Sequence, residues 1–384
     1  LNIVNIPDSV TMIGNGAFKG STTLTTLRLG NGITEIPDEL CYRCGAYPTD
    51  NKENAQLTGT SSPAMNEKDY TPIDFVGLTN VVLPDNVTRI GKNAFYECYG
   101  MKLDQTGTLP SQLGEISDYA FYRCKSLDKV VFPTSLKTIG NYAFAEAAQF
   151  IDEEYYSPSK QYKIPHQYAG LKTADFTYAT NLDTIGKFAF SKTNLTRISF
   201  PDNVVLIPES VCDGCYNLET VAEMSNNVTK IENNAFRNCF RLNSATLPFS
   251  AEWSKTIFSE AAANMSNRLT LIPTQESEDV QIHYGRDMSL TLNCFKNFTS
   301  TTLTLTDSDK ENSDPKNNLL LYDNNDYISA SLNASSQINL FGKKLGDTSV
   351  KVTGKIDLFS EKLNANEVAI SISHIYNVSV TRVP

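Results

Sequence analysis

The chain has few of the residues and motifs that catalysis needs. Its 384 residues include only three histidines, His166, His283 and His374, and none lies in a recognisable nucleophile motif. The phosphate pattern G-x-x-x-x-G-K-[ST], the dinucleotide pattern G-x-G-x-x-G and the zinc pattern H-E-x-x-H are missing. The carboxylate pair Glu153 and Glu154 lies in an expected loop, where solvation explains it. We therefore expect a protein that is not an enzyme and carries no cofactor.

Clusters of positive charge and long apolar runs are also missing. The 33 Lys and Arg residues are outnumbered by 43 Asp and Glu, and the formal charge of −10 argues against nucleic acid as a partner. No apolar run approaches the ~18 residues of a membrane span, so we expect no transmembrane segment. No signal peptide is visible, and the sequence opens inside a repeat. We therefore expect Leu1 to be a processed or engineered boundary.

The feature that organises the sequence is a recurring phrase, I-x-x-x-A-F-x-x-C. Copies or partial copies start at Ile13, Ile90, Ile116, Ile139, Ile185 and Ile231, and variants without Ala-Phe start at Ile36 and Ile207. Equivalent positions such as Phe121 and Phe144 are 23 residues apart. A period in this range predicts a solenoid, in which each unit buries its apolar face only by stacking on its neighbours.

Each unit is predicted to contain a short strand with the pattern L-x-x-L-x-L, a turn, a second short strand that ends at the repeat isoleucine, and a one-turn helical segment. At a strand spacing of ~4.8 Å, about ten units form a rod of about 45–50 Å with a continuous sheet on one flank. That sheet displays polar residues such as Arg28, Lys129 and Arg197. We also expect the repeat phenylalanines to form a buried ladder through Phe121, and Arg123 to be exposed and dispensable.

The eight cysteines follow the repeat. Five of them lie eight residues after the repeat isoleucine, and Cys41 and Cys212 lie where other units have phenylalanine. The pairs Cys41/Cys44 and Cys212/Cys215 also have the spacing of zinc half-sites. We favour buried core positions over zinc binding or a local disulfide, because free cysteine is among the most buried residue types and the repeat accounts for the spacing.

Two insertions interrupt the period, at residues 46–75 and 146–163, and both leave along the same edge. A weak repeat, 164–170, follows the second. The second insertion contains Tyr155, Tyr156 and Tyr162. Because tyrosine is enriched at interfaces, these three residues are the predicted ligand-binding site. The alternatives are that the tyrosines pin the loop to its own solenoid, or that the strand flank binds the ligand.

From about Thr274 short alternating runs replace the repeat, which predicts an antiparallel β-sandwich. The acidic tract 307–314 is a calcium candidate or a flexible hairpin loop. Its sequence fails the EF-hand pattern, because Asn312 replaces the turn glycine and Asn318 the bidentate glutamate.

Residues 1–273 resemble the BspA-like leucine-rich repeats of bacterial and protozoan surface proteins, on the strength of the phrase in residues 6–18, IPDSVTMIGNGAF. Residues 274–384 look like a bacterial Ig-like module, through the stretch 342–353, GKKLGDTSVKVT. The expected fold is therefore a leucine-rich repeat solenoid of short β-strands and short helical turns, followed by an all-β Ig-like sandwich domain.

The resemblance implies an extracellular or cell-surface protein of a bacterium that adheres to a host or bacterial surface protein or glycan. We expect a monomer. The alternative is a structural spacer or stalk that presents another domain away from the cell surface. The sequence names neither the ligand, nor the face that binds it, nor the means of anchoring.

Overall fold

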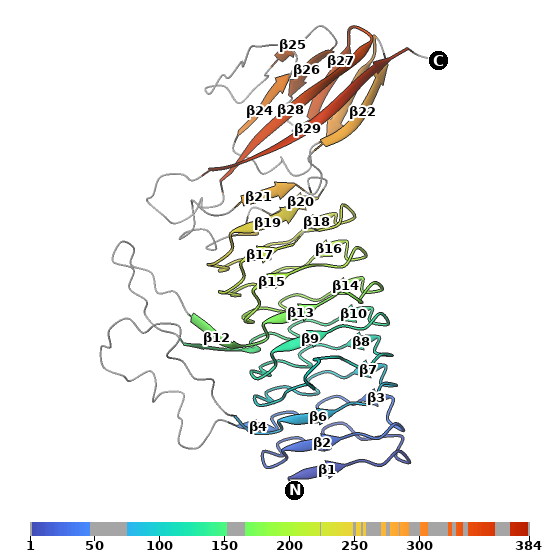
Figure 1. Ribbon diagram of the computed structural model, residues 1–384, viewed down its shortest axis with the longest axis vertical. Coiled ribbons are helices and arrows are strands. Elements are labelled where there is room, and N and C mark those ends of the chain that lie inside the picture. The colour runs from blue at the N-terminus through green and yellow to red at the C-terminus, as the bar shows by residue number, and fades with distance from the viewer. Residues whose placement is uncertain are drawn as a thin grey trace, which may run out of the picture.

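The computed structural model describes residues 2–46, 75–151, 166–222, 224–248, 251–254, 256–258, 270–273, 277–283, 285–291, 300–305, 322–324, 328–332, 337–357 and 369–382. Successive units of the chain stack along one axis. The N-terminus lies at one end of the stack and the C-terminal strands lie at the other (Figure 1).

Two columns of short parallel strands run along the stack. The first, the leucine flank, is formed by the L-x-x-L-x-L segments, and Leu27 lies in register between Val4 and Val81. Leu24, Leu27 and Leu29 are buried, which confirms the predicted inward positions. The flank comprises three sheets: β1 (Ile3–Asn5), β2 (Thr26–Arg28) and β6 (Asn80–Val82); β9 (Lys129–Val131) and β13 (Thr173–Asp175); and β15 (Arg197–Ile198), β17 (Thr220–Val221), β19 (Ser244–Leu247) and β21 (Thr270–Pro273).

The second column, the isoleucine column, aligns the repeat isoleucines from Ile36 to Ile231. Each pairs with its counterpart in the next unit of its sheet, and Trp253 takes this place after Ile231. All of these side chains are buried, so each unit covers the apolar face of its neighbour. The column comprises β3 (Glu35–Ile36), β7 (Arg89–Ile90), β8 (Glu115–Ile116), β10 (Thr138–Ile139) and β14 (Thr184–Ile185) in one sheet, and β16 (Leu206–Ile207), β18 (Lys230–Ile231) and β20 (Glu252–Trp253) in another.

The Ala-Phe segments form a third column, the turn edge, and the prediction that they are helical is wrong. The part of the chain that the structure describes contains no helix. In the unit that starts at Ile90, alternate residues from Ala94 to Cys98 donate backbone hydrogen bonds three residues back, which closes consecutive β-turns. The alternate residues from Asn93 to Glu97 donate instead to carbonyls of the next unit. A helix keeps its hydrogen bonds within one segment, whereas these turns share them with a neighbour.

The turn edge requires a left-handed backbone at two positions, three and seven residues after the repeat isoleucine. Gly16 and Gly20 occupy these positions in the first unit. This backbone costs a residue with a side chain roughly 1–2 kcal/mol, and the hydrogen bonds between units offset that cost. Thirteen non-glycine residues of the described chain hold it, with φ between 54° and 59°: Glu39, Arg43, Asn93, Glu97, Tyr119, Arg123, Tyr142, Glu146, Phe188, Lys192, Ser210, Asn234 and Asn238.

Charged side chains alternate in sign along the second of these positions, in the order Arg43, Glu97, Arg123, Glu146 and Lys192. Arg123 donates to Glu97 at 3.0 Å and to Glu146 at 2.7 Å. Burial alone would raise the pKa of Glu146, but its hydrogen bond with Arg123 and the charges of Arg123 and Lys192 lower that pKa below its ordinary value. The Arg123 side chain is 36% exposed, so it is half-buried and not freely exposed as predicted, and stacking places it between two carboxylates.

The repeat phenylalanines form the predicted ladder. Phe95, Phe121, Phe144 and Phe190 stack in order, with ring centroids 5.4, 5.1 and 5.5 Å apart. All four side chains are fully buried. Near-parallel rings at this spacing keep the aromatic core continuous from one unit to the next.

The cysteines occupy buried core positions, as predicted. The thiol of Cys98 donates to the carbonyl of Cys41 in the preceding unit at 3.0 Å, and Cys124 donates to Phe95 at 3.2 Å in the same way. Seven cysteines lie among the described residues, and all seven are free and buried. No group of three or more His, Cys, Asp or Glu side chains in those residues is arranged to hold a metal ion. The eighth, Cys294, lies outside the described residues.

Both insertions leave the array through antiparallel strand pairs on the same edge, as predicted (Figure 1). Ile36 pairs directly with Ile90, and Ile139 with Ile185, so neither insertion adds a unit to the isoleucine column. The prediction of a weak repeat at 164–170 is wrong, because residues 166–170 pair with the other side of their own insertion. The pairs are β4 (Gly45–Ala46) with β5 (Val76–Gly77), and β11 (Ala148–Ile151) with β12 (His166–Gly170).

The C-terminal strands form two four-stranded sheets. Buried side chains alternate along them, as at Val378 and Val380, which confirms the predicted strand pattern. One pair, β22 with β29, is parallel, which differs from the predicted antiparallel arrangement. The Ig-like assignment and the boundary at 273/274 stay predictions. The sheets are β22 (Ser277–His283), β29 (Ala369–Thr381), β28 (Gly346–Asp357) and β24 (Ser300–Leu305), and β23 (Asp287–Thr291), β27 (Gln337–Gly342), β26 (Ile328–Leu332) and β25 (Tyr322–Asn324).

Phe121→Ala should lower the free energy of unfolding by about 3–5 kcal/mol, because it opens a cavity in the phenylalanine ladder. Tyr178→Ala is the matched control: this side chain is 61% exposed, and its loss should change stability by less than about 0.5 kcal/mol. Urea denaturation followed by fluorescence of the single tryptophan, buried Trp253, measures both. Equal losses would contradict the assignment of interior and surface.

Glu146→Gln should lower the free energy of unfolding at pH 7 by about 1–2 kcal/mol, because it leaves Arg123 with one carboxylate partner instead of two. The pKa of Glu146 is depressed in the folded state, so the ion pair stabilises fully above the unfolded value of about 4.3 and is lost as the pH falls through the folded value. The difference between wild type and variant should therefore vanish in acid. Glu35→Gln, at an exposed position, should show no such difference. An effect of Glu146→Gln that does not depend on pH would contradict the ion pair between Glu146 and Arg123.

Thiol titration of denatured, unreduced protein should find at least seven free cysteines, and the same seven should be unreactive in the folded protein. Burial raises the pKa of the Cys124 thiol, so its contribution to stability is present at neutral pH and declines above the unfolded value of about 8.5. Elemental analysis should find no stoichiometric zinc. One zinc ion per chain bound through thiolates would show that the CxxC pairs are metal ligands.

Candidate functional site

The ligand-binding residues predicted from sequence, Tyr155, Tyr156 and Tyr162, lie outside the described residues, as does the acidic tract 307–314. The structure does show the edge from which both insertions leave. Their strand pairs follow the units of Ile36 and Ile139, which are three units apart in the isoleucine column. At ~4.8 Å per unit, the two exits are separated by about 15 Å.

The leucine flank is interrupted between β6 and β9 and again between β13 and β15, so the predicted continuous sheet is wrong at both points. The first interruption is the wider one, because a whole unit fails to pair as a strand there. The intervening unit, residues 101–109, forms only two isolated bridges, one from Lys102 to Asn80 and one from Thr108 to Val131. A unit that pairs at its two ends leaves its middle free to depart from the sheet.

A tight turn at residues 104–107 causes this departure. The Oδ1 atom of Asp104 accepts hydrogen bonds from the backbone N–H of Thr106 at 2.9 Å and of Gly107 at 3.0 Å. Gly107 has φ of 69°, which glycine adopts without strain. The aspartate accepts the hydrogen bonds of the turn, and the glycine three residues later adopts its left-handed backbone. This unit therefore turns where its neighbours continue as strands.

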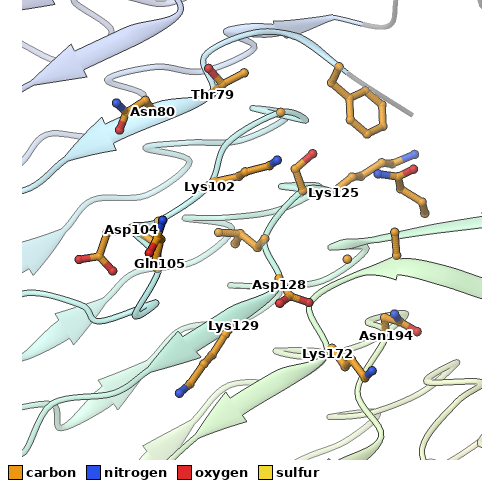
Figure 2. Close-up of a pocket in the computed structure, with 18 residues that line it drawn as sticks. Thr79, Asn80, Lys102, Asp104, Gln105, Lys125, Asp128, Lys129, Lys172 and Asn194 are labelled. Atoms are coloured by element: carbon orange, nitrogen blue, oxygen red, sulfur yellow. The ribbon is translucent and has the colours of Figure 1, made fainter. Parts of the chain in front are cut away.

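A cavity of about 920 Å³ opens at the interruption, and we call it the lysine groove. Phe75, beside the first insertion, and Gln149, Ala169 and Gly170, at the base of the second, contribute to its walls. The groove therefore lies between the two exits. Its charged lining consists of Lys102, Lys125, Lys129 and Lys172 with Asp104 and Asp128, and its amide lining includes Asn80, Gln105 and Asn194 (Figure 2).

The lining carries four lysines and two aspartates in a chain whose formal charge is −10. A hydrogen bond from the Thr106 hydroxyl lowers the pKa of Asp104. The Oδ1 atom of Asp104 is occupied by the hydrogen bonds within the turn at residues 104–107. Lys129 lies 3.9 Å from Asp175. Lys102 and Lys172 are exposed, and neither makes an ion pair with any residue that the structure describes. The lining of the groove thus carries more lysine than aspartate, on a protein whose formal charge is negative.

The repeat fixes the spacing of these lysines. The backbone N–H of Lys102 donates to the carbonyl of Thr79 in the preceding unit. The backbone N–H of Lys172 donates in the same way to the carbonyl of Asp128, so the two hydrogen bonds are equivalent in the repeat. Lys102 and Lys172 therefore occupy one repeat position, with the unit of Asp128 between them. Two steps of ~4.8 Å place their backbones about 10 Å apart. Figure 2 shows the side chains of Lys102 and Lys172 directed to one side and that of Lys129 to the other.

Sequence reasoning found only part of this groove. Of the flank residues singled out there, Lys129 lines the groove, whereas Arg28 and Arg197 do not. Lys102 was missed because residues 101–109 lack a clear L-x-x-L-x-L pattern, and Lys172 was missed because it directly follows the second insertion, where the pattern resumes at Leu171. The available signal was the change from Thr25 and Thr79 to lysine at one repeat position.

None of the described residues forms a helix of the length and hydrophobicity needed to cross a membrane. A search of the curated proteins finds no match to this chain.

Three solved structures illustrate the likeness to other repeat proteins. A leucine-rich repeat protein of T. pallidum is 20% identical over 63% of this chain and 78% of its own, with a TM-score of 0.36. A leucine-rich cell surface protein of Faecalibacterium prausnitzii is 22% identical over 71% and 79%, with a TM-score of 0.28. A leucine-rich repeat protein of Bacteroides ovatus is 20% identical over 73% and 87%, with a TM-score of 0.27.

These TM-scores are all below 0.5, so the assignment rests on the repeats themselves. The model of the BspA type leucine rich repeat region matches residues 1–59, 74–167 and 153–269, in six copies. The matched ranges include the interruption and both walls of the lysine groove. Because the match covers well over half of the chain, this protein belongs to the BspA-type leucine-rich repeat family.

Proposed function

We propose that this protein is a non-enzymatic binding protein, secreted or held at the surface of a bacterium, that adheres to a host or bacterial surface protein or glycan. The lysine groove is its ligand site. The observation that carries this proposal is the coincidence of three features at one place: the break in the leucine flank between β6 and β9, the exposed lysines Lys102 and Lys172, and the exits of both insertions.

The position of the groove on a rigid frame supports this role. Its lining residues project from units that are held on both sides by parallel pairing in the isoleucine column and by the hydrogen bonds of the turn edge. Binding sites on such a scaffold lose little conformational freedom when a ligand is bound. The protein acts as a monomer in this proposal, because one chain supplies the whole groove.

The predicted tyrosines extend the same proposal. Tyr155, Tyr156 and Tyr162 belong to the insertion whose base contributes Gln149 and Gly170 to the groove wall. A ligand seated in the groove lies next to the exit of this insertion. The tyrosines then add contact area to a site that the lysines anchor.

An array of glycans and purified surface proteins, probed with the full chain, tests the proposal. The variant Lys102→Glu/Lys172→Glu should lose at least about 90% of the signal for any specific ligand, since a tenfold weaker affinity costs only about 1.4 kcal/mol. Lys137→Glu is the matched control, because Lys137 is an exposed lysine that does not line the groove. A variant with residues 152–165 replaced by a Gly-Ser link reports on the tyrosines.

Two results would count against the groove. Ligand signals that survive the double substitution but disappear with changes at Arg28 and Arg197 would place the site on the open strand flank. A chain that binds nothing on either array would favour the alternative, a spacer that presents another domain away from the cell.

A further inference from the structure

We propose that the lysine groove binds an acidic saccharide, a sugar chain that carries carboxylate or sulfate groups. This inference rests on the proposed function, because it names the ligand class of the same groove. Its basis is the regular placement of cations among hydrogen-bonding side chains.

The cations are placed to bind a ligand with repeated negative charges. Lys102 and Lys172 are exposed, occupy the same repeat position, and are about 10 Å apart by two strand spacings. Lys125 also lines the groove, from the unit between them. An ammonium group offers three donors as a compact charge, which suits either a carboxylate or a sulfate. A polymer with acid groups on its sugars can engage Lys102 and Lys172 at once.

The remaining lining suits hydroxyl groups. Asn80 and Gln105 are exposed and offer amides that both donate and accept, and the half-buried Ser126 offers a hydroxyl. Sugar hydroxyls likewise donate and accept, so a saccharide can satisfy this lining without leaving polar groups unpaired. These groups extend along the array from the unit of Asn80 to the unit of Ser126, a length of about 10 Å at one strand spacing per unit.

The apolar lining argues against an acidic peptide as the ligand. Of the large apolar side chains in the lining, Phe75 is 6% exposed and Leu127 is 1% exposed, and Leu103 alone is half-buried, so the groove offers little apolar surface to an entering side chain. Protein partners are held mainly by aromatic and aliphatic side chains that fill such pockets. Strand addition is also disfavoured, because β9 pairs with β13 on one side and bridges to Thr108 on the other.

The experiment measures binding of the full chain to four polymers of similar size: polygalacturonate, dextran sulfate, neutral dextran and poly-L-glutamate. We expect binding to polygalacturonate, to dextran sulfate or to both, none to dextran, and weaker binding to polyglutamate. Which of the first two binds more tightly distinguishes carboxylate from sulfate. Affinity should fall between about 0.1 M and 1 M salt, where the Debye length shortens from about 10 Å to about 3 Å.

The variant Lys102→Glu/Lys172→Glu should weaken binding about tenfold, the combined effect of two partly exposed ion pairs, and Lys137→Glu should not. Lys102→Gln/Lys172→Gln removes the two charges without reversing them, so its affinity should lie between that of the double glutamate variant and that of Lys137→Glu. Thermal unfolding checks that each variant is folded. Equal affinity in all variants, tighter binding of polyglutamate, or no binding of either acidic polysaccharide would overturn the inference. A neutral or protein ligand that still depends on the groove would leave the proposed function standing.

Discussion

The hydrogen bonds between successive units set the repeat distance on which the rest of this structure depends. Parallel pairing in two strand columns, and donation from alternate residues of the turn edge, hold each unit one strand spacing from the next. Side chains at equivalent repeat positions are therefore neighbours in adjacent units. Each column contains residues that can pack or pair with a copy of the same position. Phenylalanines stack on phenylalanines, thiols donate to carbonyls of the preceding unit, and charges alternate in sign.

The same constraint explains why the turn edge keeps an uncommon backbone. At positions such as Tyr119 and Glu146 a left-handed conformation leaves one N–H free to reach the next unit. A helical segment would satisfy its own hydrogen bonds and lose this connection. The local cost is offset by contacts that exist only when units stack, so the array is stable as a whole while a single unit is not.

The candidate site lies where the repeat fails. Asp104 and Gly107 form a turn in place of a strand, and the neighbouring units continue on either side. A break of this kind in a rigid array produces a hollow with fixed walls, and the repeat spaces Lys102 and Lys172 across it. The frame supplies the geometry, and the departures from the frame supply the chemistry that a partner meets.

The sequence by itself determined the repeat, its register, the buried ladder at Phe121 and the free cysteines, because these depend on periodic burial that each unit repeats. It also located both insertions, since they interrupt that period. Only the tertiary structure decided that the turns are not helical, that Arg123 is held between two carboxylates, and that 166–170 is not a repeat. The tertiary structure also placed Lys102 and Lys172 beside the break in the leucine flank between β6 and β9, which the sequence did not show. Each of these depends on which groups lie opposite one another in adjacent units, and that neighbourhood does not exist until the chain has stacked.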